Sequence, residues 1–236
     1  MSGVTRHVTR LYLIRHGATT LSAEDRFAGS VDVDISDEGR RQAERLGERL
    51  ADDKLAAIYC SPLRRCVDTA GFVARPHGLT PIVRDGLREI AHGRWEGMRR
   101  GEVETQFAGE YAAWEADPFT FAPEGGESGL NVLARALPVI REIVVAHPGA
   151  NVAVVSHKAT LRLVISSLLG FDARGYRDRL DQNPACLNIL DFKDTVRARL
   201  MLFNDTSHYT DQPTRAKHQL SKWWDDAEHR ADGPTR

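Results

Sequence analysis

The sequence predicts one α/β domain built on a doubly wound, mostly parallel sheet that is flanked by helices on both faces. Short apolar runs typical of buried strands alternate along the chain with amphipathic stretches typical of helices. The chain of 236 residues is long enough to bury a substantial core. The polar residues best suited to chemistry follow apolar runs directly, and ligands of such sheets bind at the carboxyl ends of the strands.

The first half of the chain supplies three predicted strands and two helices. The strands are apolar runs bounded by polar or turn residues, at residues 11–14, 57–60 and 81–83. The first helix covers residues 37–51, with Ser36 as its cap. The second helix follows Ser61 and Pro62, which suit a cap and a first helical turn. Its apolar side chains recur at helical spacing: Leu63, Val67, Ala70 and Ala74.

The second half begins with a segment at 85–95 that we expect to be mostly loop. A helix over 101–116 is predicted to end before Pro118, and Ser128 is expected to cap a longer helix that is kinked at Pro138. The apolar stripe of this longer helix is Leu130, Leu133, Leu137, Ile140 and Val144. The remaining predicted elements are a strand at 152–155, a helix at 161–169 and closing strands at 186–192 and 198–203.

The α/β domain is predicted to span residues 1–210, and a charged, partly helical C-terminal tail follows at 211–236. Trp223 and Trp224 in this tail could pack on the domain, form a lid over the site or make a dimer contact. A homodimer therefore stays open as the assembly.

Charge and cysteine content exclude several classes of protein. The 32 Lys and Arg residues nearly cancel the 33 Asp and Glu residues, and a formal net charge of −1 provides no global field for nucleic acid or a membrane surface. Any bound anion must then be held by a local cluster. The three cysteines form no C-x-x-C pair, which fits a reducing compartment, and the first apolar run is too short for a signal peptide. We expect a soluble, cytoplasmic protein.

Residues suited to phosphoryl chemistry stand at predicted strand ends and helix starts: Arg15, His16, Arg64, Arg65, Glu89, Ser156 and His157. A phosphomonoester carries about two negative charges near neutral pH, and paired arginines or helix amides bind such a group well. A neutral histidine offers a nucleophilic ring nitrogen, and a second, protonated histidine would stabilise the phosphoryl oxygens. Glu89 could protonate the leaving alkoxide and then activate water. This chemistry needs no cofactor, and no metal-ligand spacing such as H-E-x-x-H is present.

These residues lie in a series of motifs, between residue 10 and about residue 208, that resembles the histidine phosphatase superfamily. This group includes the cofactor-dependent phosphoglycerate mutases and the fructose-2,6-bisphosphatase domain. The motifs are Leu13-Ile14-Arg15-His16-Gly17, Phe27-Ala28-Gly29, Ser61-Pro62-Leu63-Arg64-Arg65, Leu87-Arg88-Glu89, Gly93-Arg94-Trp95-Glu96-Gly97, Gly125-Gly126-Glu127-Ser128 and Val155-Ser156-His157.

The resemblance implies that His16 becomes phosphorylated and that Glu89 is the proton donor. The residues that it implies for phosphoryl binding are Arg15, Arg65 and His157. Of the two adjacent arginines, the family pattern selects Arg65, two positions after Leu63, so Arg64 is expected to face solvent.

The chain departs from the family pattern at Lys158, where glycine is common, at Ala18, where a polar residue is common, and at Ser22, where asparagine is common. These changes concern the substrate and leave the phosphoryl centre intact. The residues expected to bind substrate are Ser22, Phe27, Ala28, Gly29, His92, Lys158 and His208. For His92, Lys158 and the segment 204–208, a solvated loop is an equally simple interpretation.

The family's mutases resemble one another in a Glu-Arg-His-Tyr-Gly stretch and in a basic, proline-rich insert. This chain has Glu89-Ile90-Ala91-His92-Gly93 instead, and its segment 114–126 contains no basic residue. Both differences favour a metal-independent phosphatase that hydrolyses a small-metabolite phosphomonoester through a phosphohistidine intermediate. The alternatives are a cofactor-dependent phosphoglycerate mutase and, from another class, a catalytically weak phosphate-binding or scaffold protein.

Overall fold

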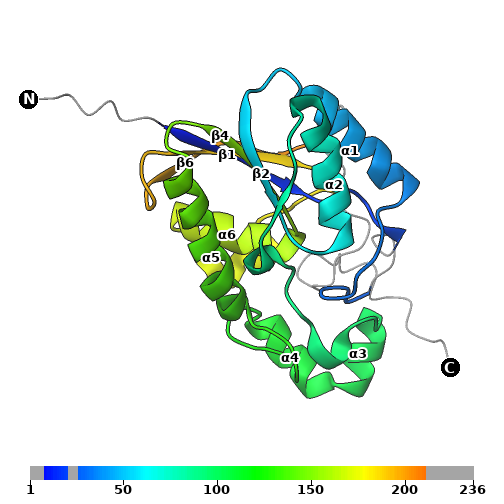
Figure 1. Ribbon diagram of the computed structural model, residues 1–236. Helices are drawn as coiled ribbons and strands as arrows, with labels where there is room; N and C mark the ends of the chain where they lie inside the picture. Colours follow the sequence, from blue (N-terminus) through cyan, green and yellow to red (C-terminus); the bar gives the residue numbers. More distant parts are fainter. Residues whose placement is uncertain (1–7, 21–25, 211–236) are drawn as a thin grey trace, which may run out of the picture.

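A computed structural model describes residues 8–20 and 26–210 (Figure 1), so the predicted tail at 211–236 and Ser22 lie outside the described residues. In the described part, six strands form one sheet in the order β3-β2-β4-β1-β5-β6. They are β1 (Thr9–Arg15), β2 (Leu55–Cys60), β3 (Ile82–Val83), β4 (Asn151–Ser156), β5 (Leu187–Phe192) and β6 (Ala198–Asp205). The first four run parallel, and β5 and β6 are antiparallel additions beside β1. The predicted mostly parallel sheet is confirmed.

Helices cover both faces of the sheet (Figure 1). α1 (Asp37–Arg49) and α2 (Arg64–Ala74) lie on one face, and α5 (Gly129–Ala146) and α6 (Lys158–Leu169) lie on the other. Successive strand side chains point to opposite faces. Tyr12 and Ile14 of β1 therefore join the core under α1 and α2, whereas Leu11 and Leu13 join the core under α5 and α6.

A smaller helical region lies beyond the end of the sheet (Figure 1). It contains α3 (Arg100–Gln106) and α4 (Ala108–Ala116), and the short α7 (Tyr176–Arg179) follows α6 in the chain. Five aromatic or apolar side chains form the buried core of this region: Phe27, Trp95, Val103, Tyr111 and Trp114. Short 3-10 turns occur at Arg75–His77, Asp85–Leu87, Gly93–Trp95 and Ala173–Gly175.

The single helix predicted over 101–116 is wrong, because the chain turns at Phe107 and forms two helices. The backbone angles of Phe107 (φ −129°, ψ 42°) are not helical. Its ring packs on the aromatic core and under the guanidinium of Arg94, 4.3 Å from the ring centre. Burial of this ring accompanies the break in an otherwise periodic sequence.

Two further details of the helices differ from the sequence prediction. α2 begins at Arg64, so Ser61 and Pro62 precede it and Ser61 does not serve as its cap. In α5, Leu130 is 53% exposed, and the buried face instead uses Val132, Ala136, Ile140, Ile143 and Val144. Ser128 does cap this helix, by accepting a hydrogen bond from the amide of Asn131.

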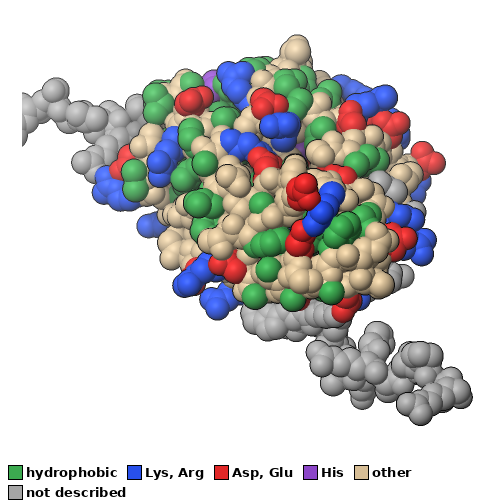
Figure 2. All heavy atoms as spheres, turned by 90° about the horizontal axis from the view of Figure 1, so that it is seen from below, with side chains coloured by type: hydrophobic (Ala, Val, Ile, Leu, Met, Phe, Trp, Pro, Cys, Tyr) green, Lys and Arg blue, Asp and Glu red, His purple; other side chains and the backbone are tan. Residues whose placement is uncertain are grey.

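The near-neutral net charge reflects charges of both signs mixed on the surface. On the face shown in Figure 2, Lys and Arg side chains are interspersed with Asp and Glu side chains.

Within 8–20 and 26–210, no helix combines the length and the apolar character that crossing a membrane would require. Cys60, Cys66 and Cys186 are all buried and unpaired.

Candidate active site

The carboxyl ends of three neighbouring strands bring together residues that are far apart in the sequence. β1, β4 and β2 are adjacent and parallel, so the residues that follow them meet at one edge of the sheet. His16 follows β1 and donates its backbone N–H to the carbonyl of Ser156 over 3.0 Å. His157 follows β4, and its ring centre lies 5.2 Å from that of His16.

His16 presents a neutral ring with a defined tautomer. Its Nδ1 lies 2.7 Å from the carbonyl oxygen of Gly17. Because a carbonyl only accepts hydrogen bonds, Nδ1 carries the proton and Nε2 keeps its lone pair. Burial, together with the charges of Arg15 and Arg65, holds the pKa of His16 well below its usual value of 6.5. His16 therefore has the nitrogen that a nucleophile needs.

The loop that carries His16 packs backbone to backbone on the start of α1. A Cβ atom at Gly17 would lie 2.5 Å from the carbonyl oxygen of Gly39, so only glycine fits there. The amide of Gly17 donates to Oγ1 of Thr69, and the amide of Ala18 donates to Oε1 of Gln42, each over 3.0 Å. These contacts hold the loop that carries His16 against α1 and α2.

His157 is completely buried and is neutral in the phosphate-free site. Arg65 donates from Nε to Nδ1 of His157 over 3.2 Å. A guanidinium only donates, so the proton of the imidazole is on Nε2, which lies 2.7 Å from Oγ of Ser61. Burial and the neighbouring charges of Arg65, His16 and Arg15 hold the pKa of His157 well below 6.5. The protonated second histidine expected from the sequence concerns the site with a phosphoryl group bound, and a phosphate dianion would favour that protonation.

Arg65 is 2% exposed and ties the loop after Gly29 to the site. It donates to the carbonyls of Gly29 (2.6 Å) and Val31 (2.7 Å), and together with the bond to His157 this leaves two of its five N–H groups for a ligand. Arg64 is exposed and pairs with Asp34 over 3.1 Å, as the sequence predicted for the solvent-facing member of the pair. Of these two adjacent arginines, only Arg65 is therefore in a position to bind a buried phosphoryl group.

Arg15 also points into the interior. It donates to the carbonyl of Gln182 over 2.6 Å, and its buried Nε has no partner among the described residues. Burial lowers the pKa of this guanidinium. Because an unpaired buried donor is costly, its presence favours a ligand that accepts hydrogen bonds.

The side chain of Glu89, from the loop before α3, reaches the N-terminus of α6. Its carboxylate accepts hydrogen bonds from the amides of Ala159 and Thr160 and from the hydroxyl of Thr160, each at 3.1 Å. Amides at the start of a helix were among the phosphate donors that the sequence suggested. The α6 amides instead hold the carboxylate of Glu89, because α6 begins directly after His157 and its positive end attracts the nearer anion.

Arg135 on α5 holds the loop that carries Glu89, and sequence reasoning missed it. Its guanidinium donates to the carbonyls of Gly86 (3.0 Å), Arg88 (2.8 Å) and Glu89 (2.9 Å), and both Glu127 oxygens accept from it at 2.8 Å. All five N–H groups are used. The Gly-Glu-Ser motif contains Glu127, so this motif was the signal that could have indicated such a partner.

Glu96 appears in the sequence analysis only as part of the motif at residues 93–97, without a role of its own. The structure shows that its carboxylate accepts hydrogen bonds from the amides of Gly29 (3.0 Å), Ser30 (2.9 Å) and His92 (2.8 Å). A Cβ atom at Gly29 would lie 1.8 Å from the carbonyl of Ile90, so the two loops touch at this glycine. Glu96 therefore joins the loop after Phe27 to the loop after Glu89.

Phe27 does not line a binding site in this structure. It is completely buried between Trp95 and Trp114 and contacts the ring of His92, with 5.0 Å between ring centres. The expectation that Phe27 contacts substrate is therefore wrong for this state, because the aromatic core encloses its ring. Ala28, beside it, is half-buried.

Lys158 and His208 occupy different surroundings. Lys158 is the first residue of α6, and its Nζ lies 3.1 Å from Asp181.

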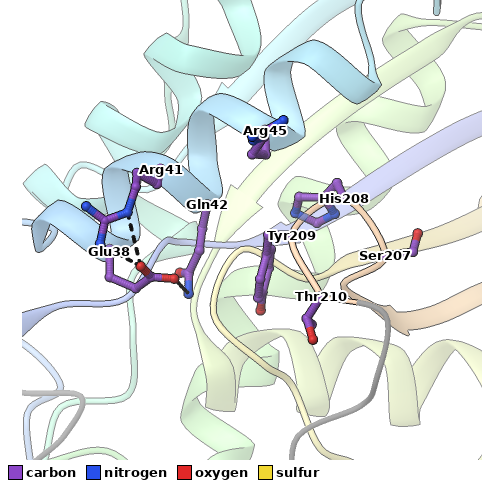
Figure 3. Close-up of a pocket in the computed structure, with 8 residues that line it drawn as sticks. All are labelled: Glu38, Arg41, Gln42, Arg45, Ser207, His208, Tyr209 and Thr210. Carbon is purple, nitrogen blue, oxygen red and sulfur yellow. Dashed lines mark hydrogen bonds and ion pairs between the residues drawn. The ribbon is translucent and has the colours of Figure 1, made fainter.

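His208 belongs to a separate cavity of about 380 Å³ between α1 and the segment after β6 (Figure 3). Within the described part of the chain, no contact joins His208 to His16, Glu89 or His157. The residues that line this cavity are Glu38, Arg41, Gln42, Arg45, Ser207, His208, Tyr209 and Thr210.

The site has the groups that phosphoryl transfer requires, because the neutral imidazole of His16 lies close to the guanidinium groups of Arg15 and Arg65. Comparison with known protein families gives the same result. The family model described as histidine phosphatase superfamily (branch 1) matches residues 11–206, and the chain belongs to this superfamily.

Several relatives in sequence and in structure are named phosphatases. Phosphoserine phosphatase 1 of Hydrogenobacter thermophilus is 34% identical over 165 residues, which are 70% of this chain and 78% of the relative. Glucosyl-3-phosphoglycerate phosphatase of Mycolicibacterium vanbaalenii is 36% identical over 170 residues, or 69% and 75% of the two chains. The native structure of a mycobacterial glucosyl-3-phosphoglycerate phosphatase superimposes with a TM-score of 0.76 at 30% identity, covering 84% of this chain and 99% of that one.

YhfR of Bacillus stearothermophilus superimposes with a TM-score of 0.79 at 30% identity, over 85% of this chain and 98% of that chain. These similarities make the chain a phosphomonoesterase of the histidine phosphatase type.

Proposed function

We propose that this protein hydrolyses phosphomonoesters of small metabolites in two steps, through a phosphohistidine on His16 and without a metal ion. The observation that carries the proposal is the tautomer of His16, whose Nδ1 proton is bound by the Gly17 carbonyl and whose Nε2 lone pair is free. Two arginines and a second histidine surround this ring, so the charge of a phosphoryl group is matched without a cation from solution.

In the first step, Nε2 of His16 attacks phosphorus and the ester P–O bond breaks. The bonding electrons leave with the alkoxide, which takes a proton from the carboxylic acid of Glu89. Arg15 and Arg65 supply hydrogen bonds to the phosphoryl oxygens, and His157 supplies a further donor once it is protonated or turned toward them. The alcohol leaves, and phosphohistidine remains.

In the second step, the carboxylate of Glu89 takes a proton from water, and the water oxygen attacks phosphorus. The P–N bond breaks, and its electrons return to Nε2 of His16. Phosphate leaves and Glu89 again carries the proton that the next cycle needs. Hydrogen bonds from the amides of Ala159 and Thr160 hold the carboxyl group of Glu89 in place for both steps.

The sequence favours hydrolysis over a mutase reaction, because segment 114–126 lacks the basic residues that would hold a phosphorylated intermediate in place. One relative, from Arabidopsis thaliana, is named phosphoglycerate mutase-like protein 4, at 32% identity over 155 residues. Net isomerisation of a phosphoglycerate with little phosphate release would identify a mutase instead.

We also propose a cytoplasmic location and no nucleic-acid or membrane partner, in keeping with the buried, unpaired cysteines and balanced charge.

The test is p-nitrophenyl phosphate hydrolysis in EDTA, followed by rapid acid-free quenching with ³²P-labelled substrate. We expect turnover without added metal and an acid-labile label on the protein. His16→Ala should abolish both, whereas His77→Ala, at the surface turn after α2, should retain both. Activity that requires a divalent ion, or a label that persists in His16→Ala, contradicts the mechanism.

A further inference from the structure

Beside the phosphoryl site, cationic side chains converge on one short segment. Nζ of Lys158 lies 3.1 Å and Nη2 of Arg162 lies 3.0 Å from the same oxygen of Asp181. The next residue, Gln182, uses its carbonyl to accept a hydrogen bond from Arg15. The segment 181–182 therefore connects an arginine of the phosphoryl site to a second group of cations.

This second group is built into the protein and is not a surface charge cluster. Arg162 is 6% exposed, and its Nε has no hydrogen-bond partner in residues 8–20 and 26–210. Nε of Arg15 is in the same condition. The side chain of Lys158 is 27% exposed, so a ligand can reach the group from solvent at this residue.

Lys158 and Arg162 share one carboxylate, that of Asp181, and both bind the same oxygen of it. The nearby Asp178 is bound by Arg177 through two hydrogen bonds of 2.9 Å, and Arg177 also pairs with Glu115 over 3.3 Å. Asp178 is therefore not a further partner for Lys158 and Arg162. An anionic ligand would give hydrogen-bond acceptors to the ammonium of Lys158 and to the unpaired Nε of Arg162.

We propose that Lys158 and Arg162 bind a carboxylate of the substrate, so that the preferred substrates are phosphate monoesters of small carboxylic acids. This inference rests on the proposed function, because it places the carboxylate on the molecule whose phosphate reaches His16. The two oxygens of a carboxylate suit an ammonium beside a guanidinium, and its single charge can be held by Lys158 and Arg162 without displacing Asp181.

The position of Lys158 limits the size of such a substrate. Lys158 follows His157 directly, and consecutive Cα atoms lie about 3.8 Å apart. We therefore expect the two anionic groups of the substrate to be joined by a short spacer. The family pattern commonly has glycine at this position, so phosphoryl transfer itself does not require the lysine, and the residue is available to select the substrate.

Buried surroundings also tune the ammonium of Lys158. Burial and the charges of Arg162 and Arg15 lower its pKa to about 7, against the opposing effect of Asp181. A bound carboxylate would stabilise the charged form. Binding of the second anionic group and protonation of Lys158 are therefore coupled.

The experiment compares two competitive inhibitors of p-nitrophenyl phosphate hydrolysis. 3-Phosphoglycerate and sn-glycerol 3-phosphate differ in that the first has a carboxylate where the second has a hydroxymethyl group. We expect the inhibition constant of 3-phosphoglycerate to be at least tenfold lower in the unchanged protein. In Lys158→Met the ratio of the two constants should fall to near one, and Lys158→Arg should restore most of it. The ratio within each variant cancels any general loss of activity.

Two controls keep the result specific. Lys54→Met removes an exposed lysine just before β2 and should leave the ratio unchanged. Asp181→Asn removes the competing carboxylate and should increase the preference for 3-phosphoglycerate. If Lys158 served only as a structural partner of Asp181, both Lys158→Met and Asp181→Asn would lower the melting temperature without changing the ratio.

Equal inhibition constants in the unchanged protein, or a preference that survives in Lys158→Met, would overturn the carboxylate site. Tighter inhibition by propane-1,3-diol bisphosphate than by 3-phosphoglycerate would overturn the choice of a singly charged group. Failure of the proposed function is separate, because it would appear as no His16-dependent hydrolysis of p-nitrophenyl phosphate. In that case, calorimetric binding of the two compounds to the same variants still measures the site.

Discussion

Nε of Arg65 lies 3.2 Å from Nδ1 of His157, and this contact determines which nitrogen of the histidine carries its proton. Because the guanidinium can only donate, Nε2 of His157 carries the proton and faces Ser61. Three residues from two strand ends thus form one chain of hydrogen bonds, and the orientation of His157 depends on both neighbours.

Removal of the Ser61 hydroxyl is expected to loosen His157. Ser61→Ala leaves a buried N–H without its acceptor, which costs on the order of 1–3 kcal/mol. We expect kcat/KM for p-nitrophenyl phosphate to fall by about tenfold or more, with a lower melting temperature. Ser167→Ala, on the half-buried end of α6, is the matched control and should change neither quantity. Full activity in Ser61→Ala would show that His157 is held without this bond.

The role of Glu89 as a general acid predicts that the effect of its removal depends on the leaving group of the substrate. Glu89→Gln keeps the hydrogen bonds to Ile90 and the α6 helix approximately in place but has no proton to donate. Turnover of an alkyl phosphate should fall by about 10²- to 10⁴-fold, and p-nitrophenyl phosphate should suffer less because its leaving group needs less help. Phosphate should still bind, as isothermal calorimetry can measure. Equal losses for both substrates, or a loss as large in the exposed control Glu142→Gln, would argue against the acid role.

Arg135 should act as a positioning residue for Glu89. Arg135→Lys keeps the charge but cannot reproduce five hydrogen bonds in a plane. We expect kcat to fall by about tenfold with a small change in KM, and the loss should depend on the leaving group as it does in Glu89→Gln. Arg141→Lys, exposed on the same helix, is the control. If Arg135→Lys lowers the melting temperature but reduces turnover equally for alkyl and p-nitrophenyl phosphates, Arg135 has a structural role only.

The buried neutral histidines predict how stability depends on pH. The folded-state pKa of His16 is well below 6.5, whereas the unfolded chain binds the proton near 6.5. Its contribution to stability is therefore complete above pH 6.5 and is lost as the pH falls toward the folded-state pKa. The slope is about 1.4 kcal/mol per pH unit for one histidine.

Urea unfolding at pH 7, 6 and 5, without phosphate, measures this dependence. His157, His92 and His208 have lowered pKa values as well, so the unchanged protein contains several contributions. The difference between the protein and His16→Asn isolates one of them. We expect the variant to lose less stability between pH 7 and pH 5. Parallel stability curves for the two proteins would contradict a neutral, buried His16.

Much of the fold could be predicted because its signals are local. The apolar runs of β1 and β4 are buried on both faces, and Ser36 and Ser128 cap their helices as their positions indicate. The break at Phe107 could not be predicted, since the segment is periodic and only burial of the ring accompanies the turn. The exposure of Leu130 likewise depends on which side of α5 meets the sheet.

The sequence by itself determined the superfamily and the alternation of strands and helices along the chain. Short motifs indicate the superfamily, and local apolar periodicity indicates the elements. The tertiary structure alone decided the tautomers of His16 and His157, the capture of the α6 amides by Glu89, and the convergence of Lys158 and Arg162 on Asp181. Each of these depends on hydrogen bonds or charges between residues from separate parts of the chain. Local sequence does not specify the distance between residues that are far apart in the chain. Such contacts form only when the folded sheet brings the ends of its strands together.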